Sequence, residues 1–125
     1  MSLHAILSDK LSPLVGPFSQ AVRAGDFLFL SGQVGLDASG RLVDGGITAQ
    51  AEQIFTNLAA VLDAAGKSFA DVVRAGVFLA DMGDFAALNA VYAKHFDEPY
   101  PARTTVAVAA LPLGAAVEID LVVKA

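Results

Sequence analysis

The sequence predicts a single domain, spanning residues 1–125, in which short β-strands are interspersed with two α-helices. Short apolar runs rich in β-branched and aromatic residues, bounded by Gly, Pro and Asp, indicate the strands. Two longer stretches with apolar residues at three- and four-residue spacing indicate amphipathic helices. A chain of 125 residues is also long enough to bury one substantial hydrophobic core.

The first third of the chain predicts strands separated by turns. Residues 1–13 hold at most one short strand, and residues 18–22 can extend after a glycine–proline turn. Residues 27–30 form a continuous apolar run, which is typical of a strand covered on both faces. The run stops at Ser31 and Gly32, where small residues would let the backbone approach a ligand or another chain closely. A simple bulge or turn is the alternative interpretation.

The clearest helix is predicted over residues 47–65. Apolar residues recur along it at helical spacing, whereas Gln50 and Asn57 occupy other sides. Thr48 is placed to cap the start of this helix, and Gly66 is expected to close its end. The apolar stripe predicts core packing rather than a cofactor site.

A second helix is predicted after a buried strand over residues 71–79. Asp81 or Asp84 is expected to cap this helix. Asn89 lies within it and is consistent with an ordinary surface amide. The apolar stripe of the helix consists of Phe85, Leu88, Tyr92 and Phe96.

Arg103 is the candidate residue with the most specific chemistry. It opens a predicted strand after two prolines, which forbid helix and favour an extended entry. From Thr104 the residues alternate, with Val106 on the face expected to be buried. An arginine at a rigid strand edge offers two parallel donors to a carboxylate or phosphate. An arginine whose charged end merely extends into water is the alternative.

A last strand is predicted over residues 117–123. The tight turn before it would make it the antiparallel neighbour of the Arg103 strand. Matching of the buried faces then places Arg103 and Thr105 on one polar sheet face. Glu118 and Asp120 are expected to share that face. The alternative is a solvated outer face with an Arg–Glu cross-strand pair, worth about 0.2–1 kcal/mol.

The composition points to an oligomer. Hydrophobic residues make up 55% of the chain and charged residues only 17%, whereas about 45–50% and about 25% are usual. A small protein with so little charge is expected to hide part of its surface against other subunits.

Charge and residue usage disfavour several kinds of partner. The net charge of −5 and the scattered Lys and Arg residues argue against nucleic-acid binding. No apolar run approaches the roughly 18–20 residues of a membrane span, so no membrane partner is expected. The absence of Cys excludes disulfides and fits a cytoplasmic location. With only His4 and His95 as imidazole ligands, no transition-metal site is expected.

A series of short motifs, spread over nearly the whole chain, occurs in an order and spacing typical of a known family. The motifs are Gly16-Pro17-Phe18-Ser19-Gln20-Ala21, Ser31-Gly32-Gln33, Gln50…Asn57-Leu58, Leu62…Ala65-Gly66, Asp84-Phe85…Asn89…Tyr92…Phe96, Pro101-Ala102-Arg103-Thr104, Leu111-Pro112 and Val117-Glu118-Ile119. Together they resemble the Rid family of reactive-intermediate imine deaminases, whose older names include a translation inhibitor and a ribonuclease.

The resemblance implies a chorismate-mutase-like α+β fold, with a mixed β-sheet and two helices packed on one face. It implies a homotrimer with sites in the clefts between subunits. It also implies hydrolytic deamination of 2-imino or enamine acids, such as 2-aminoacrylate and 2-iminopropanoate, to 2-oxo acids and ammonia. No metal, flavin or pyridoxal cofactor is expected for this reaction.

The resemblance also implies roles for particular residues. Arg103 is expected to clamp the substrate carboxylate. The side chain of Glu118 and the backbone carbonyl of Thr105 are expected to hold the hydrolytic water. The other residues expected to bind substrate are Phe18, Ser31, Gly32 and Asn89.

Two departures from the family pattern keep other functions open. Family members often carry Tyr in place of Phe18, and many carry Cys in place of Thr105. The loss of a hydroxyl at Phe18 favours the alternative of a non-catalytic trimer that binds a small carboxylate or has a regulatory role. RNA cleavage is a third hypothesis, which the acidic balance of the chain disfavours.

Overall fold

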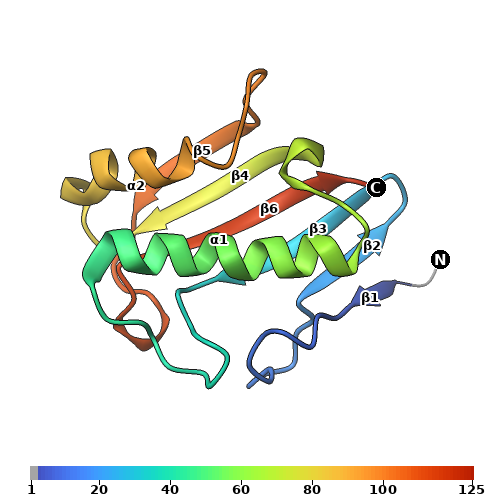
Figure 1. The fold of residues 1–125 in the computed structure, drawn as a ribbon, viewed down its shortest axis with the longest axis horizontal. Helices are drawn as coiled ribbons and strands as arrows, with labels where there is room; N and C mark the ends of the chain where they lie inside the picture. Colours follow the sequence, from blue (N-terminus) through green and yellow to red (C-terminus); the bar gives the residue numbers. More distant parts are fainter. Residues whose placement is uncertain (1–2) are drawn as a thin grey trace.

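The computed structural model describes residues 3–125 and shows one mixed β-sheet with two α-helices on one of its faces (Figure 1). The first two residues of the predicted domain therefore lie outside the described residues. The six strands follow the order β1-β2-β3-β6-β4-β5. The elements are β1 (His4–Ile6), β2 (Ala21–Ala24), β3 (Phe27–Gln33), α1 (Gly46–Ala64), β4 (Val72–Leu79), α2 (Phe85–Tyr92), β5 (Ala102–Ala107) and β6 (Val117–Lys124). The α+β class is confirmed.

The sheet is mixed because one strand pair differs in sense from the others. Strands β4 and β5 are parallel, whereas all other neighbouring pairs are antiparallel. Helix α2 lies in the crossover connection that joins the parallel strands β4 and β5. This connection places α2 over the β4–β5 edge of the sheet, beside α1 (Figure 1).

The core lies between the helices and one face of the sheet. Ile54 and Leu58 of α1 are fully buried. Val117 and Ile119 of β6 are fully buried as well. Because side chains alternate along a strand, Glu118, which lies between Val117 and Ile119, points to the opposite face. The apolar stripe of the first helix is thereby confirmed as core.

The start of α1 differs from the prediction. Gly45, with φ 112°, is the N-cap, and no side chain caps the helix. Thr48 lies inside the helix, so its predicted capping role is wrong. A left-handed glycine turns the chain into the helix one residue earlier than expected. Gly66 follows the other end with φ 71°, as predicted.

Two amides of α1 that were expected away from the core are buried. The Gln50 Oε1 atom accepts a hydrogen bond of 2.8 Å from the Ala116 backbone N–H. The Asn57 Nδ2 atom donates to the Leu36 carbonyl at 2.9 Å. These bonds attach two loops to the helix, which explains why polar side chains are tolerated there.

The second helix is shorter than predicted. It ends at Tyr92, and His95 lies in the turn that follows. The Asp81 side chain accepts a hydrogen bond of 2.8 Å from the Gly83 N–H, in a short 3-10 turn that leads into α2. Of the two candidate caps, Asp81 therefore acts at this turn, whereas the Asp84 side chain makes no capping hydrogen bond.

The predicted pairing of the last two strands is wrong. Strand β4 lies between β5 and β6, so the strands that carry Arg103 and Glu118 are not neighbours. Thr105 pairs with Val77, which in turn pairs with Ile119 on the helix-covered face. Arg103 and Thr105 therefore point toward the helices. A turn between two strands predicts a hairpin, but here the last strand inserts on the far side of β4.

Glu118 and Asp120 lie on the face of the sheet opposite to the helices. Val106, which was expected to be buried, lies on that same outer face and is 40% exposed. The predicted gathering of Arg103 and Thr105 with these two carboxylates on one face is therefore wrong within a single chain.

The outer face of the sheet is uncovered in this chain. Leu28 and Leu30 of β3 are buried under the helices, whereas Phe27 and Phe29 are 42% and 45% exposed. The prediction that this strand is covered on both faces is therefore wrong for the single chain. Among residues 3–125, no helix is long and apolar enough to span a membrane. The cytoplasmic location stays a prediction.

Candidate active site

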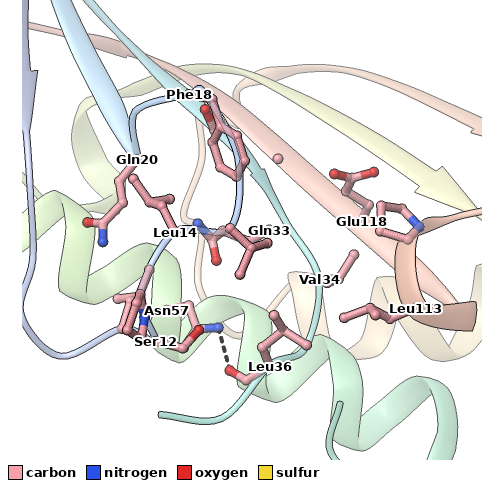
Figure 2. A pocket seen from close by; sticks show the side chains of 16 residues that line it. Ser12, Leu14, Phe18, Gln20, Gln33, Val34, Leu36, Asn57, Leu113 and Glu118 are labelled. Atoms are coloured by element: carbon pink, nitrogen blue, oxygen red, sulfur yellow. Dashed lines mark hydrogen bonds between the residues drawn. The ribbon is translucent and has the colours of Figure 1, made fainter. Parts of the chain in front are cut away.

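A cavity of about 540 Å³ opens beside the end of β3 (Figure 2). Its walls come from the loop before β2, the end of β3, α1, the turn before β6, and β6 itself. Four of the predicted site residues line it, namely Phe18, Ser31, Gly32 and Glu118. The remaining lining residues are Leu11, Ser12, Pro13, Leu14, Val15, Gln20, Gln33, Val34, Leu36, Asn57, Pro112 and Leu113.

Gly32 allows the Glu118 side chain to lie against the backbone of β3. A Cβ atom built on Gly32 would overlap the Glu118 carboxylate, whose Cδ atom would be 2.9 Å away. The pairing of β3 with β6 shifts register between Leu30 and Gln33. The bulge interpretation is therefore confirmed, and it brings the backbone close to the Glu118 side chain of the same chain. Close approach to a ligand or to another chain stays a prediction.

Glu118 has the electrostatics of an acid–base group. Burial raises its pKa above the ordinary glutamate range, and the negative charge of Asp120 raises the pKa further. Among the described residues, no ion pair includes Glu118. A cavity carboxyl whose pKa moves toward neutrality can accept a proton and return it during a reaction.

Ser31 holds the loop that carries Phe18. Its Oγ donates a hydrogen bond of 2.6 Å to the Ser19 carbonyl, and its backbone N–H donates to the Gln20 carbonyl at 2.9 Å. The Phe18 side chain lines the cavity and is 51% exposed. Ser31 therefore orders the cavity wall, because its hydroxyl proton is already engaged by the loop.

Arg103 lies away from the cavity, on the α2 side of the sheet. Its Cζ atom lies 4.6 Å from the centroid of the Tyr92 ring and 5.6 Å from that of Phe85. Asn89 lies on the same helix, four residues after Phe85 and three before Tyr92, and so shares a face with them. The Thr105 hydroxyl is buried and has no hydrogen-bond partner among residues 3–125.

The predicted site residues thus form two groups in one chain. Asp120, which was expected near Arg103, instead lies beside Gly76 and Arg74. Burial raises the pKa of Asp120, whereas a hydrogen bond from the Gly76 backbone and the Arg74 charge lower it. Within the described part of the chain, no three metal-binding side chains gather. The first group is Phe18, Ser31, Gly32 and Glu118 at the cavity, and the second is Arg103, Thr105 and Asn89 on β5 and α2.

The sequence interpretation missed the contacts between Arg103 and the rings of α2. Phe85 and Tyr92 were assigned to a core stripe, although side chains on that face of the helix also contact the strand beneath it. It also missed the apolar wall of the cavity to which Leu14 and Leu113 contribute. No local signal marks these two leucines, because both lie in segments without regular periodicity.

Comparisons with known proteins support the fold and the motifs. A family described as Endoribonuclease L-PSP matches residues 9–125. Protein DfrA of Myxococcus xanthus is 50% identical, over 98% of this chain and 95% of its own length. A goat (Capra hircus) protein named 2-iminobutanoate/2-iminopropanoate deaminase is 47% identical, over 96% of this chain and 89% of its own length.

A solved structure extends the likeness to three dimensions. RidA from an Antarctic Psychrobacter superposes with a TM-score of 0.92 and 46% identity, covering 98% of this chain and 99% of that chain. The match therefore covers nearly the whole sheet with both helices. By sequence and by structure, this chain belongs to the Rid family, whose family description is Endoribonuclease L-PSP.

Proposed function

We propose that the protein hydrolyses reactive 2-imino and enamine acids to 2-oxo acids and ammonia. The observation that carries the proposal is Glu118, a half-buried carboxyl with a raised pKa that lies in a cavity against Gly32. The goat relative, at 47% identity, is named for a reaction of this kind. A 2-iminoacid offers the site two groups to recognise, a carboxylate and an electrophilic imine carbon.

The reaction needs little assistance from the protein, because the imine carbon already reacts with water. In the first step the water oxygen bonds to that carbon and the C=N π pair moves to nitrogen. Glu118 takes a proton from the water and delivers it to the nitrogen. In the second step Glu118 carries the remaining hydroxyl proton to the nitrogen, the C–N bond breaks, and ammonia leaves a 2-oxo acid.

The second group of residues is proposed to hold the substrate. Arg103 binds the carboxylate through two parallel N–H donors, which fixes the distance between the imine carbon and the water. The backbone carbonyl of Thr105 helps to hold that water. This role is supported by the place of β5 at the edge of the sheet, where backbone groups on one side have no neighbouring strand. Asn89 completes the cleft beside Arg103, and Phe18, Ser31 and Gly32 complete it beside Glu118.

The protein is further proposed to act as a homotrimer with its sites between subunits. Arg103 and Glu118 lie on opposite faces of one sheet, so one substrate can touch both only if a second copy supplies one of them. The outer face also exposes Phe27, Phe29 and Val106 by 40% or more of their surface. Such an apolar face is stabilised by burial against another copy.

A binding protein without turnover is the second candidate. The observation that favours it is Phe18, whose ring replaces a phenol frequent in the family and joins Leu14 and Leu113 in an apolar cavity wall. Such a wall can retain the side chain of a small carboxylic acid without helping its hydrolysis. RNA cleavage, which the family description suggests, is disfavoured by the net charge of −5.

An enamine generated in situ by a pyridoxal enzyme provides the test. The rate of 2-oxo acid formation is measured with this protein, with a matched concentration of Glu118→Gln, and with neither. Acceleration by the parent alone supports the proposal. Equal rates in all three reactions contradict turnover, and binding of a carboxylate analogue by calorimetry would then favour the second candidate.

A further inference from the structure

Arg103 is held by aromatic rings and not by a carboxylate. Its Cζ atom lies over the Tyr92 ring at 4.6 Å and over the Phe85 ring at 5.6 Å. Both distances are within the roughly 6 Å at which a cation is attracted by the face of a ring. Ion pairs in the part of the chain that the structure describes join Glu52 to its neighbours, and none includes Arg103.

A ring holds a guanidinium differently from an acidic side chain. The N–H donors of arginine lie in the plane of the guanidinium, and a carboxylate partner would occupy two of them. A ring attracts the charge through its face and leaves those donors free. Contact with Tyr92 therefore restrains Arg103 without competing with an incoming anion.

Tyr92 is the more deeply buried of the two rings. It is 7% exposed, and its ring lies 4.5 Å from the Phe96 centroid and 6.0 Å from that of Phe55 in α1. Phe85 is 38% exposed at the start of α2. The position of Arg103 is thus tied to the hydrophobic core mainly through Tyr92.

The ring of Tyr92, and not its hydroxyl, makes this contact. The hydroxyl is buried and has no hydrogen-bond partner among residues 3–125. Burial raises the pKa of Tyr92, an effect that the positive charge of Arg103 opposes. The phenol therefore keeps its proton at neutral pH, and phenylalanine at this position would present the same face to the guanidinium.

We propose that Tyr92 is a positioning residue, whose ring holds the Arg103 guanidinium where the substrate carboxylate binds. This role rests on the carboxylate-binding function proposed for Arg103 above. It explains why an apolar face of α2 lies over Arg103, the charged residue on the helix side of β5.

Two substitutions distinguish the effect of the aromatic face of Tyr92 from the effect of the size of its side chain. Tyr92→Phe keeps the ring, and kcat/KM for the enamine substrate should stay within about twofold of the parent. Tyr92→Leu removes the ring face, and kcat/KM should fall about tenfold or more because the clamp is misplaced. In an Arg103→Ala background, Tyr92→Leu should cause no further loss. If Tyr92→Leu does not fold, Tyr92→Met replaces it.

Phe69→Leu is the matched control for a disturbed aromatic cluster. Phe69 contacts the rings of Phe55 and Phe96 but has no ring contact with Arg103. This variant should keep the parent kcat/KM. A loss as large as that of Tyr92→Leu would mean that the cluster, and not the contact with Arg103, sets activity, and would overturn the proposal.

A spectroscopic measurement tests the contact without substrate. The Nε–H resonance of Arg103, assigned through Arg103→Lys, should be shifted by the ring current in the parent and in Tyr92→Phe. It should return toward the position of a free arginine in Tyr92→Leu. Parent-like activity and an unmoved resonance in Tyr92→Leu would overturn the positioning role alone. Parent-like activity in Arg103→Ala would instead overturn the proposed clamp.

Discussion

Glu118 lies in a cavity against the backbone of β3, whereas Arg103 lies over the rings of α2. Neither side chain has an ion-pair partner within residues 3–125. The surroundings of Glu118 disfavour its charge, because burial and Asp120 both raise its pKa. The rings of Tyr92 and Phe85 attract the guanidinium of Arg103 through their faces and leave its N–H donors free. One region is therefore suited to proton transfer and the other to holding an anion.

The two regions are also separated in space. They lie on opposite faces of the sheet, two strands apart, so one chain alone holds two halves of a proposed site. A carboxyl with a raised pKa can move a proton but cannot orient a substrate. An arginine can orient a substrate but cannot serve as a base at neutral pH. The experiments below test whether the halves act together.

Loss of the Arg103 half is expected to have the largest effect. Arg103→Lys keeps the charge but loses the two parallel donors, and a misplacement of about 1 Å can cost on the order of a hundredfold in kcat/KM. Arg103→Ala should lose more, while far-UV circular dichroism stays normal. An Arg103→Lys variant within a few-fold of the parent in the enamine assay would contradict the clamp.

Mixing the two halves provides the matched control for this prediction. Arg103→Ala and Glu118→Gln chains, each inactive alone, should recover about a quarter of the parent activity when co-assembled in equal amounts. Random assembly would pair complementary copies at one interface in four. Light scattering of the mixture should give about three times 12.8 kDa. A mixture as inactive as its components would mean that the halves do not meet across subunits.

Glu118→Gln tests the proton-transfer half and should lower kcat by about a hundredfold. In the parent, kcat/KM should rise with pH as Glu118 loses its proton, with an apparent pKa above the ordinary glutamate range. The rise should be absent in Glu118→Gln. Binding of a carboxylate analogue should persist, because Arg103 is untouched. An identical pH profile in the two proteins would make Glu118 a bystander.

The same pKa shift has a consequence for stability. The folded protein keeps the Glu118 proton over a pH interval in which the unfolded chain has already released it. The free energy of unfolding therefore falls as pH rises through that interval. Thermal melting should show Glu118→Gln gaining stability relative to the parent as pH rises toward neutrality.

Gly32→Ala should reduce kcat/KM about tenfold, because its Cβ would displace the Glu118 carboxylate. Gly76→Ala is a matched control, since a Cβ there would crowd Asp120 on the same sheet face but outside the cavity. Equal losses in the two variants would indicate a general disturbance of the sheet. A loss confined to Gly32→Ala would link the close approach to catalysis.

Phe18→Tyr should have the smallest effect. If a hydroxyl at the cavity mouth binds substrate, the variant should tighten analogue binding by up to about 1 kcal/mol, one modest hydrogen bond. The measurement is calorimetry with a carboxylate analogue. Unchanged or weaker binding would mean that the apolar wall around Leu14 and Leu113 suits a bulkier side chain.

Much of the fold and half of the candidate site could be predicted from the sequence. The helix over residues 46–64, the strand with Ser31 and Gly32 at its end, and the alternation that separates Glu118 from Ile119 are all local patterns. Such patterns survive in the structure because the period of a helix or strand is set by its own backbone. Gly32 was singled out as a point of close backbone approach, and the group that it meets within the chain is the Glu118 side chain.

The sequence by itself therefore determined the elements, which side chains share a face of each strand, and the residue types available for chemistry. Only the tertiary structure decided that β6 inserts between β3 and β4, which sends Arg103 to the rings of α2 and leaves Glu118 in the cavity. The order of strands depends on pairing between distant segments, which has no periodicity along the chain. For that reason, alternation predicted which side chains of one strand share a face, but not which faces of different strands lie on the same side of the sheet.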